Sequence, residues 1–581
     1  MRTLFSFFER FLRYRGTLLL GFLCIPMAQL ADVALTVVVG DAITRMQTAP
    51  DTEFMRGMLL LFALFVVVHA IFRFAQRWLL VVVSRRVEIQ LKRDLFDKLT
   101  SLPFSFHNQS RSGDVVSRLT SDVENIRMFL GPGLMYTAGA MVVVPITIVL
   151  LFSLNPALAL TMTLPMVLMG TAMKLLTPRL HRHSLAVQES LADISHRAQE
   201  NFSGIRIVKG YAREDQQAAL FERTSRENMV NQVELGRARS VMNAAIHGAN
   251  DLTFVSILII GGLALIDRRL VDGDLFKFID LTFKVFWPLI ALGWIAGMYP
   301  RAVASAQRIM ELLGRESDIE EPQQPRELER VDGRIDLEGV HFTYPEAATP
   351  ALSGIDLAVP SGSTLAVVGP TGCGKSTLLN LLGRLHEPEG TIRLDGVPIR
   401  ELSLSTLRAA FGYVPQDSFL FSESYEANIR FGADRALSDA EVEALIERAC
   451  MTEEVAAFPD GVDQVIGERG VSLSGGQRQR TCIARALARN PRVLVLDDCL
   501  SAVDTETEKE LVSNLRDVGE GRTVILAAHQ LSTVRSAEQV LVLTVEGTPA
   551  DLGTHDQLIE RPGWYRDTWR QQQRLEELSG L

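Results

Sequence analysis

The chain has 581 residues, of which 47% are hydrophobic and 22% are charged, and its mean hydropathy is +0.15. This length exceeds one ordinary domain, and the hydropathy predicts one membrane-embedded part and one ordinary globular part. The formal net charge of −10 argues against a nucleic-acid-binding protein, since those usually carry a basic surface. The five cysteines have neither zinc-ligand nor disulfide spacing, so we expect reduced thiols facing the cytoplasm or the membrane.

The N-terminal half contains apolar segments that are long enough to cross a bilayer, whose hydrocarbon core needs about 20 helical residues. Six candidate segments lie at 17–40, 57–83, 131–152, 157–176, 241–266 and 276–298. Before the first of them, "RTLFSFFERFLRYRG" places Phe and Leu between arginines at helical spacing, which predicts a helix in the cytoplasmic membrane interface. A signal peptide is the alternative, but the apolar run is too long and no small-residue cleavage site follows.

Lysine and arginine are concentrated in the two long connections between these segments, as Arg85, Arg86 and Lys92 illustrate. The connection between the third and fourth segments is only "SLNP". The positive-inside rule therefore predicts that the long connections and both termini are cytoplasmic. Helical periodicity in the long connections predicts membrane helices that extend into the cytoplasm and turn back through short cross-pieces, with candidates at 108–119 and 203–215.

A charged, proline-containing linker precedes a region in which strands alternate with helices. There, "STLAVVGPTGCGKSTLLNLLGRL" has the order strand, loop and helix, and its loop fits GxxxxGK[ST]. In such a loop, backbone N–H groups and the helix N-terminus approach phosphate oxygens, Lys375 supplies positive charge, and the Ser376 hydroxyl is a magnesium ligand. The predicted nucleotide-binding residues here are Gly369, Pro370, Thr371, Gly372, Cys373, Gly374, Lys375, Ser376 and Thr377.

Two later strands end in polar residues. The apolar run 493–496 precedes Asp497, where a magnesium ligand is expected. The strand "RTVILAAH" ends in His529, which follows the other two motifs in order and is predicted to contact the γ-phosphate. The alternative for His529 is a purely structural histidine.

The most selective motif is "LSGGQ" at 473–477, directly before "RQRTCIARAL" and about one hundred residues after the phosphate loop. With these motifs the chain resembles an ATP-binding cassette (ABC) exporter half-transporter over essentially its whole length. The resemblance implies an α-helical polytopic membrane domain with six transmembrane helices at 1–315, a linker at 316–332, and an α/β P-loop cassette domain at 333–581. It also implies that two chains form one transporter, with each ATP held between the phosphate loop of one chain and the signature of the other.

The same resemblance implies roles for further residues. Tyr344 in "HFTYP" would stack on adenine, and Gln416 in "YVPQD" would be the Q-loop glutamine, close to magnesium and to the reacting water. Asp504 in "SAVD" matches the D-loop, and "GERG" at 467–470 matches an exporter-type motif before the signature. The signature residues that would act on the partner's ATP are Ser474, Gly475, Gly476 and Gln477.

Asp498 departs from the family pattern, because glutamate, the general base, normally follows the strand aspartate. The pKa values of both side chains lie near about 4, but aspartate is shorter by about 1.5 Å. A misplacement of about 1 Å can lower a rate about 100-fold. We therefore predict that the site on this chain's own phosphate loop binds ATP but hydrolyses it slowly.

The complete signature would nevertheless serve a competent site on a partner that carries the usual glutamate. The Asp-Asp pair, with a leucine two residues on, also resembles one subunit of bacterial heterodimeric multidrug exporters. The alternative is a homodimer with two equally slow sites.

Charged residues inside membrane spans are costly and usually functional. Arg73 and Arg77, like Asp280 and Lys284, are four residues apart and therefore share a helix face. One interpretation is a substrate cavity, and the other is that these charges pair across helices or lie near the cytoplasmic ends. The candidate cavity residues are Asp32, Arg73, Arg77, Asp280, Lys284, Phe286 and Trp287.

We therefore predict an ATP- and Mg²⁺-dependent exporter subunit in the cytoplasmic membrane, with its cassette in the cytoplasm. Its cargo is expected to be amphipathic or hydrophobic, as for multidrug exporters, and its partner a second half-transporter. A lipid flippase would share every motif and differ only in cargo. A membrane protein that is gated by ATP without pumping is the remaining alternative.

Overall fold

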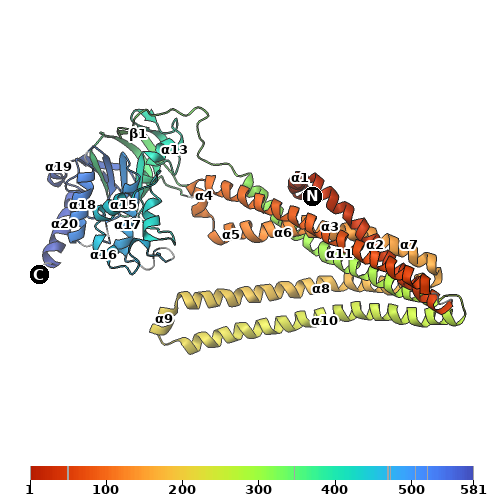
Figure 1. Cartoon of the computed structure of the whole chain (residues 1–581). Helices are drawn as coiled ribbons and strands as arrows, with labels where there is room; N and C mark the ends of the chain where they lie inside the picture. The colour runs from red at the N-terminus through yellow and green to blue at the C-terminus, as the bar shows by residue number, and fades with distance from the viewer. Residues whose placement is uncertain are drawn as a thin grey trace. The chain divides into compact units, whose positions relative to one another are not determined.

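The structure of the protein is a computed structural model that describes residues 2–48, 52–345, 347–467, 470, 473–500, 502–503, 505–519 and 521–579. The chain forms two compact units. The first comprises Met1–Thr100 and Gly113–Arg315, and the second comprises Ser101–Ser112 and Glu316–Leu581. The first unit is built of long helices, and the second combines sheets with shorter helices (Figure 1).

The first unit follows the predicted helical pattern. Its helices are α1 (Arg2–Leu12), α2 (Arg15–Thr48), α3 (Thr52–Ser101), α5 (Ser112–Ser117), α6 (Val123–Met128), α7 (Leu134–Leu154), α8 (Pro156–Ser203), α9 (Ile205–Gly210), α10 (Glu214–Ile266) and α11 (Asp272–Leu313). By length and composition, five helical segments of the described chain can cross a membrane: α2, α3, Ser112–Leu154, α10 and α11. The sixth predicted segment, 157–176, lies within α8, some of whose side chains fall outside the described residues.

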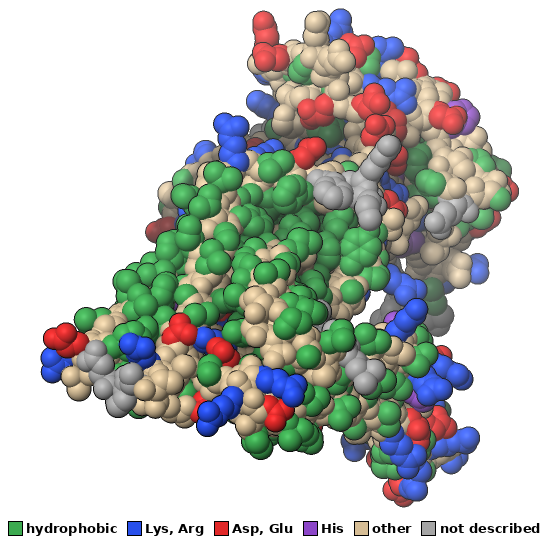
Figure 2. All heavy atoms as spheres, turned by 90° about the vertical axis from the view of Figure 1, so that its right-hand side faces the viewer, with side chains coloured by type: hydrophobic (Ala, Val, Ile, Leu, Met, Phe, Trp, Pro, Cys, Tyr) green, Lys and Arg blue, Asp and Glu red, His purple; other side chains and the backbone are tan. Residues whose placement is uncertain are grey.

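The surface and the interior of this unit differ as expected for a membrane domain. Leu59, Leu60 and Leu64 of α3 leave 68%, 72% and 56% of their surfaces exposed, and Figure 2 shows a broad hydrophobic patch on one face of the molecule. Soluble proteins rarely expose large apolar patches, so this surface suits contact with lipid. The interior contains buried apolar residues from α2, α7, α8, α10 and α11, among them Val33, Val143, Leu158, Ile257 and Phe278.

The cross-pieces between the long helices are short helices. The first is α4 (Phe104–Gln109), which clusters with the second unit and begins one turn before the predicted segment 108–119. Pro103 explains this position, because proline disfavours a helical conformation in the residue before it, so that α3 ends at Ser101. The second is α9, within the predicted segment 203–215, and it joins α8 to α10, which run side by side (Figure 1).

The second unit contains two sheets. The six-stranded sheet has the order β10-β9-β3-β8-β7-β6, in which β10 is antiparallel to β9 and the other neighbours are parallel. Its strands are β3 (Thr364–Val368), β6 (Phe411–Val414), β7 (Val493–Asp497), β8 (Thr523–Ala527), β9 (Gln539–Leu543) and β10 (Pro549–Gly553). The four-stranded antiparallel sheet consists of β2 (Leu352–Val359), β1 (Ile335–Phe342), β4 (Glu389–Leu394) and β5 (Val397–Pro398).

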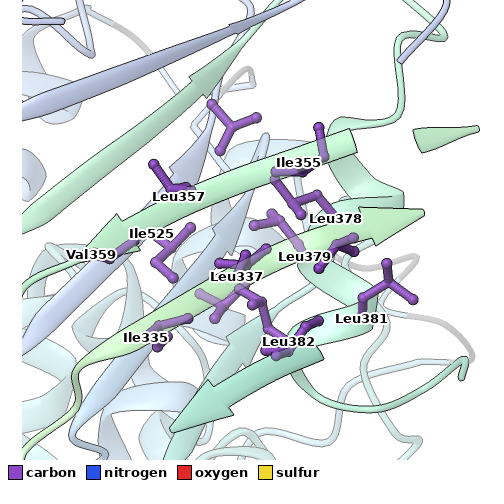
Figure 3. Packing of buried hydrophobic residues seen from close by; sticks show 14 of the residues in the cluster. Ile335, Leu337, Ile355, Leu357, Val359, Leu378, Leu379, Leu381, Leu382 and Ile525 are labelled. Atoms are coloured by element: carbon purple, nitrogen blue, oxygen red, sulfur yellow. The ribbon is translucent and has the colours of Figure 1, made fainter. Parts of the chain in front are cut away.

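Helices cover these sheets. They are α12 (Lys375–Leu382), α13 (Leu404–Ala409), α14 (Tyr425–Arg430), α15 (Asp439–Arg448), α16 (Thr452–Ala456), α17 (Gly475–Ala488), α18 (Thr505–Gly519), α19 (His555–Glu560) and α20 (Trp564–Ser579). Leucines of α12 belong to one buried apolar cluster with residues of β1 and β2 and with Ile525 of β8 (Figure 3). The helix that follows the phosphate loop is therefore part of the core that joins the two sheets, which fixes the position of the loop.

Candidate functional site

The phosphate loop lies between β3 and α12. Gly374 occupies the left-handed region at φ +94°, and a Cβ atom there would lie 2.5 Å from the carbonyl oxygen of Ala351. Only glycine fits this turn, because both its backbone conformation and its surroundings exclude a side chain. Thr371 and Gly372 are exposed at the tip of the loop, whereas Cys373 is buried beneath it. The tip is therefore open to a ligand while its base is anchored.

The structure brings the loop next to Asp497, as the motif order predicts. Lys375 donates from Nζ to the carbonyl oxygens of Gly369 (2.9 Å) and Pro370 (3.2 Å). Ser376 donates from Oγ to Oδ1 of Asp497 at 2.9 Å. Burial raises the pKa of Asp497, and the hydrogen bond from Ser376 opposes that rise. A hydroxyl and a carboxylate oxygen thus lie together beside the phosphate loop.

Asp498 and His529 lie at the same edge of the six-stranded sheet. Strands β7 and β8 are parallel and pair Asp497 with Ala527, so the residues that follow each strand emerge side by side. Asp498 donates its backbone N–H to the carbonyl oxygen of Ala527 at 3.0 Å. Asp498 and His529 line one cavity of about 210 Å³, which Glu508 also lines.

A residue that the sequence reasoning missed helps to hold this segment. Gln479 of α17 donates from Nε2 to the carbonyl oxygen of Asp498 at 3.5 Å and accepts the backbone N–H of Ala502 at 3.1 Å. Its position two residues after "LSGGQ" is the only signal in the sequence that points to it. The signature helix is therefore connected to the backbone of the candidate base within the same chain.

The signature forms the N-terminus of α17. Ser474 accepts from the backbone N–H of Gln477 at 3.2 Å, and Gln477 accepts in return from the backbone N–H of Ser474 at 3.0 Å. This capping box satisfies donors that a helix start leaves unpaired. A Cβ atom on Gly476 would lie 2.8 Å from the carbonyl oxygen of Ala502, and one on Gly475 3.3 Å from the Ala502 side chain. Small residues are therefore required where the signature meets the segment after β7.

The remaining predicted cassette residues occupy less enclosed positions. Tyr344 follows β1 and shares a 3.0 Å hydrogen bond between its hydroxyl and Oγ1 of Thr377, which is buried in α12. Gln416 is exposed, two residues after the end of β6. Asp504 lies outside the described residues, as do Glu468 and Arg469 of "GERG".

His386 connects the aromatic residues near Tyr344 with α4. Its ring lies 5.4 Å from that of Tyr344, 5.2 Å from that of Phe342 and 5.9 Å from that of Phe104. Burial lowers the pKa of His386, so the ring is neutral near pH 7. The residue expected to contact adenine and the first cross-piece therefore pack against the same imidazole, which no sequence motif indicated.

The membrane unit contains a second candidate site, a cavity of about 340 Å³ between α2, α3, α7 and α11. Five predicted residues line it: Asp32, Arg73, Arg77, Lys284 and Trp287. Phe286 does not, because it is buried against Met169 and Ala249 instead. The helical repeat of about 3.6 residues explains this difference, since a residue two positions from Lys284 lies on the opposite side of α11. Asp280 also lies outside the lining.

Lys284 pairs with one acidic residue on another helix and with one on its own helix. Nζ of Lys284 lies 2.7 Å from a carboxylate oxygen of Asp32 on α2 and 3.6 Å from one of Asp280, and Asp280 accepts a hydrogen bond from Thr36. Pairing across helices therefore holds for Asp32 and Lys284, whereas Asp280 forms its ion pair within α11. Arg73 contacts Nε2 of His69 at 3.3 Å, but neither Arg73 nor Arg77 forms an ion pair with any residue that the structure describes.

Comparison with known proteins identifies the family. Residues 18–289 match the ABC transporter transmembrane region, and residues 352–501 match the ABC transporter domain. The chain is 33% identical over 569 residues to the multidrug resistance-like ATP-binding protein MdlA of Escherichia coli (strain K12), an alignment that covers 97% of this chain and 94% of that protein. The chain belongs to the ABC transporter family.

This ABC transporter is similar to other exporters as well. It is 33% identical to the ATP-dependent lipid A-core flippase of Photobacterium profundum, over 84% of this chain and 83% of that protein. The structure of a bacterial Atm1-family ABC exporter with ATP bound matches with a TM-score of 0.76 and 27% identity, over 96% of this chain and 98% of that chain.

The predictions of family and fold class are thus confirmed. The chain is a half-transporter of exporter type, with a helical transmembrane domain followed by an α/β nucleotide-binding domain that binds ATP. Such exporters act as dimers in a lipid bilayer and couple ATP hydrolysis to transport, and this one is a multi-pass inner-membrane protein.

Proposed function

We propose that this chain is one half of a heterodimeric exporter of amphipathic or hydrophobic compounds, with both termini in the cytoplasm. Its own ATP site would turn over slowly, and its signature would complete the fast site of a different chain that carries glutamate at the position of Asp498. The observation that carries the proposal is an aspartate in the place of the base beside an otherwise complete set of motifs. The similarity to a multidrug resistance-like protein supports the class of cargo.

In the proposed mechanism, backbone N–H groups of the phosphate loop and Lys375 hold the phosphates of ATP. Ser376 and Asp497 offer adjacent oxygen ligands, the donor type that Mg²⁺ prefers, so they would hold the ion together with Gln416. Bound Mg²⁺ would neutralise charge on the transferred phosphoryl group. Tyr344 would stack on adenine, and His529 would contact the γ-phosphate.

The slow site follows from the reach of Asp498. Its backbone N–H is bound to Ala527 and its carbonyl oxygen to Gln479, so the backbone cannot readily shift forward to compensate for a missing methylene. The carboxylate would therefore stand about 1.5 Å short of a glutamate. Such a displacement lowers a rate by about 100-fold. ATP binding would remain, because the phosphate loop is complete.

Transport would follow from differential binding of ATP to the closed pair of cassettes. Closure would be transmitted through the cross-pieces α4 and α9, and the membrane cavity would change from inward-facing to outward-facing. Hydrolysis at the partner's site would then reset the dimer.

The decisive experiment is magnesium-dependent ATP turnover of the purified chain beside Asp498→Glu, with native mass spectrometry of the same samples. Asp460→Glu, an exposed aspartate in the same domain, controls for the added methylene. We expect a nearly inactive, poorly dimeric wild type and higher turnover for Asp498→Glu alone. A stable homodimer with brisk turnover that the glutamate barely changes would refute the proposal.

A lipid flippase is the second candidate, favoured by the similarity to a lipid A-core flippase. The two functions share every residue of the cassette site and differ in the cargo that stimulates turnover. Stimulation by lipids and not by amphipathic drugs would favour the flippase.

A further inference from the structure

The membrane cavity holds more positive charge than its own residues neutralise. Asp32, Arg73, Arg77 and Lys284 line it, and Lys284 is already paired with Asp32 and with Asp280. Arg73 and Arg77 form no ion pair with any described residue. Both arginines lie in α3, which can cross a membrane by its length and composition, and charged residues within such helices are costly and usually functional.

The two arginines are placed to act on one group. They are one turn apart on α3, a spacing that puts their Cβ atoms about 5–6 Å apart. A guanidinium group binds phosphate, sulfonate or carboxylate through two parallel hydrogen bonds. His69 lies one turn before Arg73 on the same face of α3. It contacts Arg73 and adds a polar group to the lining of the cavity.

Other parts of the lining contribute apolar and aromatic side chains. Tyr136 of α7 and Phe283 and Trp287 of α11 belong to it. The volume of about 340 Å³ is within the range of small-molecule sites, about 300–1,000 Å³. The lining therefore combines two cationic side chains of α3 with apolar and aromatic side chains of α7 and α11.

We propose that this cavity binds anionic amphipathic compounds, with the acid group between Arg73 and Arg77 and the apolar body against Tyr136, Phe283 and Trp287. The inference rests on the proposed export function and names the substrate class of that transporter. The acid group can belong to a lipid headgroup or to a soluble amphipath, since both present the same chemistry.

The test uses two probes with the same dansyl fluorophore and alkyl chain, one ending in a sulfonate and the other in a trimethylammonium group. Their binding to the full chain is measured by fluorescence titration in nanodiscs of phosphatidylcholine, without ATP. The variants are Arg73→Gln/Arg77→Gln and the charge-preserving Arg73→Lys/Arg77→Lys. Arg56→Gln is the matched control, since Arg56 lies on the same helix outside the cavity lining.

We expect the double glutamine variant to bind the sulfonate probe at least about tenfold more weakly, because a hydrogen bond to a charged group is worth about that factor or more. The ammonium probe should bind weakly to the wild type and no more weakly to this variant. The lysine variant should retain part of the sulfonate affinity, because it keeps the charge but loses the two parallel hydrogen bonds, and Arg56→Gln should retain all of it. Equal affinity for both probes, equal losses for both, or full sulfonate affinity without the arginines would overturn the inference.

The same preparation separates the two sources of the acid group. Phosphatidylglycerol repels the sulfonate probe from any bilayer, so its effect on the double glutamine variant is the baseline. Replacing part of the phosphatidylcholine with phosphatidylglycerol should weaken sulfonate binding to the wild type more than to that variant only if anionic lipid competes for the arginines. Equal weakening would favour a soluble amphipath.

Failure of the inference and failure of the proposed function are also distinguishable. ATP-driven uptake of the probes into inside-out vesicles tests export, with the transporter assembled with its partner or in the Asp498→Glu background, so that turnover is measurable. If replacing Arg73 and Arg77 does not change export, the proposed anion site is wrong and the proposed export function stands. Arginine-dependent binding without ATP-driven uptake would support the site and refute export.

Discussion

In the cassette, Ser376, Ser474 and Gln479 are each hydrogen-bonded within the same unit, whereas Arg73 and Arg77 in the membrane unit have no ion-pair partner among the described residues. Donors that are fixed in advance lose little freedom when charge develops on a ligand. The cassette site is therefore built for one ligand, and its residues form recognisable motifs. The membrane cavity has long side chains and aromatic walls, which suit a class of ligands and leave no motif.

The largest effect is expected from the removal of the phosphate-loop cation, which tests whether the cassette site is built around one ligand. In the Asp498→Glu background, in which turnover is measurable, we expect Lys375→Ala to weaken ATP binding and to lower turnover by at least about 100-fold, the size found when a positioned charge-stabilising donor is lost. Titration with a fluorescent ATP analogue measures the binding. A change below tenfold would contradict the assignment of Lys375 to the phosphates.

The charges in the membrane unit give the next largest effect. Lys284→Met leaves the carboxylates of Asp32 and Asp280 without their cation, which should lower stability by about 2 kcal/mol, because breaking a partly buried pair leaves an uncompensated charge. Thermal unfolding in detergent measures it, and Asp32→Asn/Lys284→Met should recover part of the loss.

A surface pair provides the control for that experiment. Arg237 lies 2.7 Å from Glu234 on α10, with both side chains largely exposed. Arg237→Met should change stability by less than about 1 kcal/mol, as is usual for exposed pairs. Equal losses for Lys284→Met and Arg237→Met would mean that Lys284 is not in a low-dielectric setting.

Gln479 tests whether hydrogen bonds within the cassette position the candidate base. Gln479→Ala removes two hydrogen bonds that hold the backbone at Asp498 and Ala502. We expect turnover to fall about tenfold, because small displacements near the reacting atoms are costly, while ATP affinity stays unchanged. The assay needs the transporter assembled with its partner or the Asp498→Glu background, so that turnover is measurable. An equal loss of ATP affinity would indicate general misfolding.

The smallest effect concerns pH. Burial lowers the pKa of His386 below its ordinary value of 6.5, so the folded state resists protonation while the unfolded state accepts a proton. Stability from this residue is therefore full above about pH 6.5 and falls as the pH drops from there toward the folded pKa. His386→Phe should remove that part of the pH dependence. Midpoints of thermal unfolding at pH 7.5 and 5.5 measure it, and an unchanged difference would exclude His386 as its source.

Much of the fold could be predicted from the sequence because its signals are local. Runs of about 20 apolar residues predict spanning helices, and the glycine-lysine pattern predicts a strand, a loop and a helix around Lys375. The departure from the family pattern at Asp498 could also be predicted, because this residue directly follows Asp497 in the sequence.

The tertiary structure decided which distant residues meet. No sequence pattern shows that Lys284 pairs with Asp32, that Gln479 reaches Asp498, or that His386 lies between Tyr344 and Phe104. Sequence spacing shows which residues share a helix face, but not which neighbouring helix that face meets. Phe286 illustrates this limit, because its packing against α8 and α10 depends on the rotation of α11. The charge balance of the membrane cavity likewise arises only when α2, α3 and α11 come together, because the charged residues of the lining lie on these three helices, far apart in the chain.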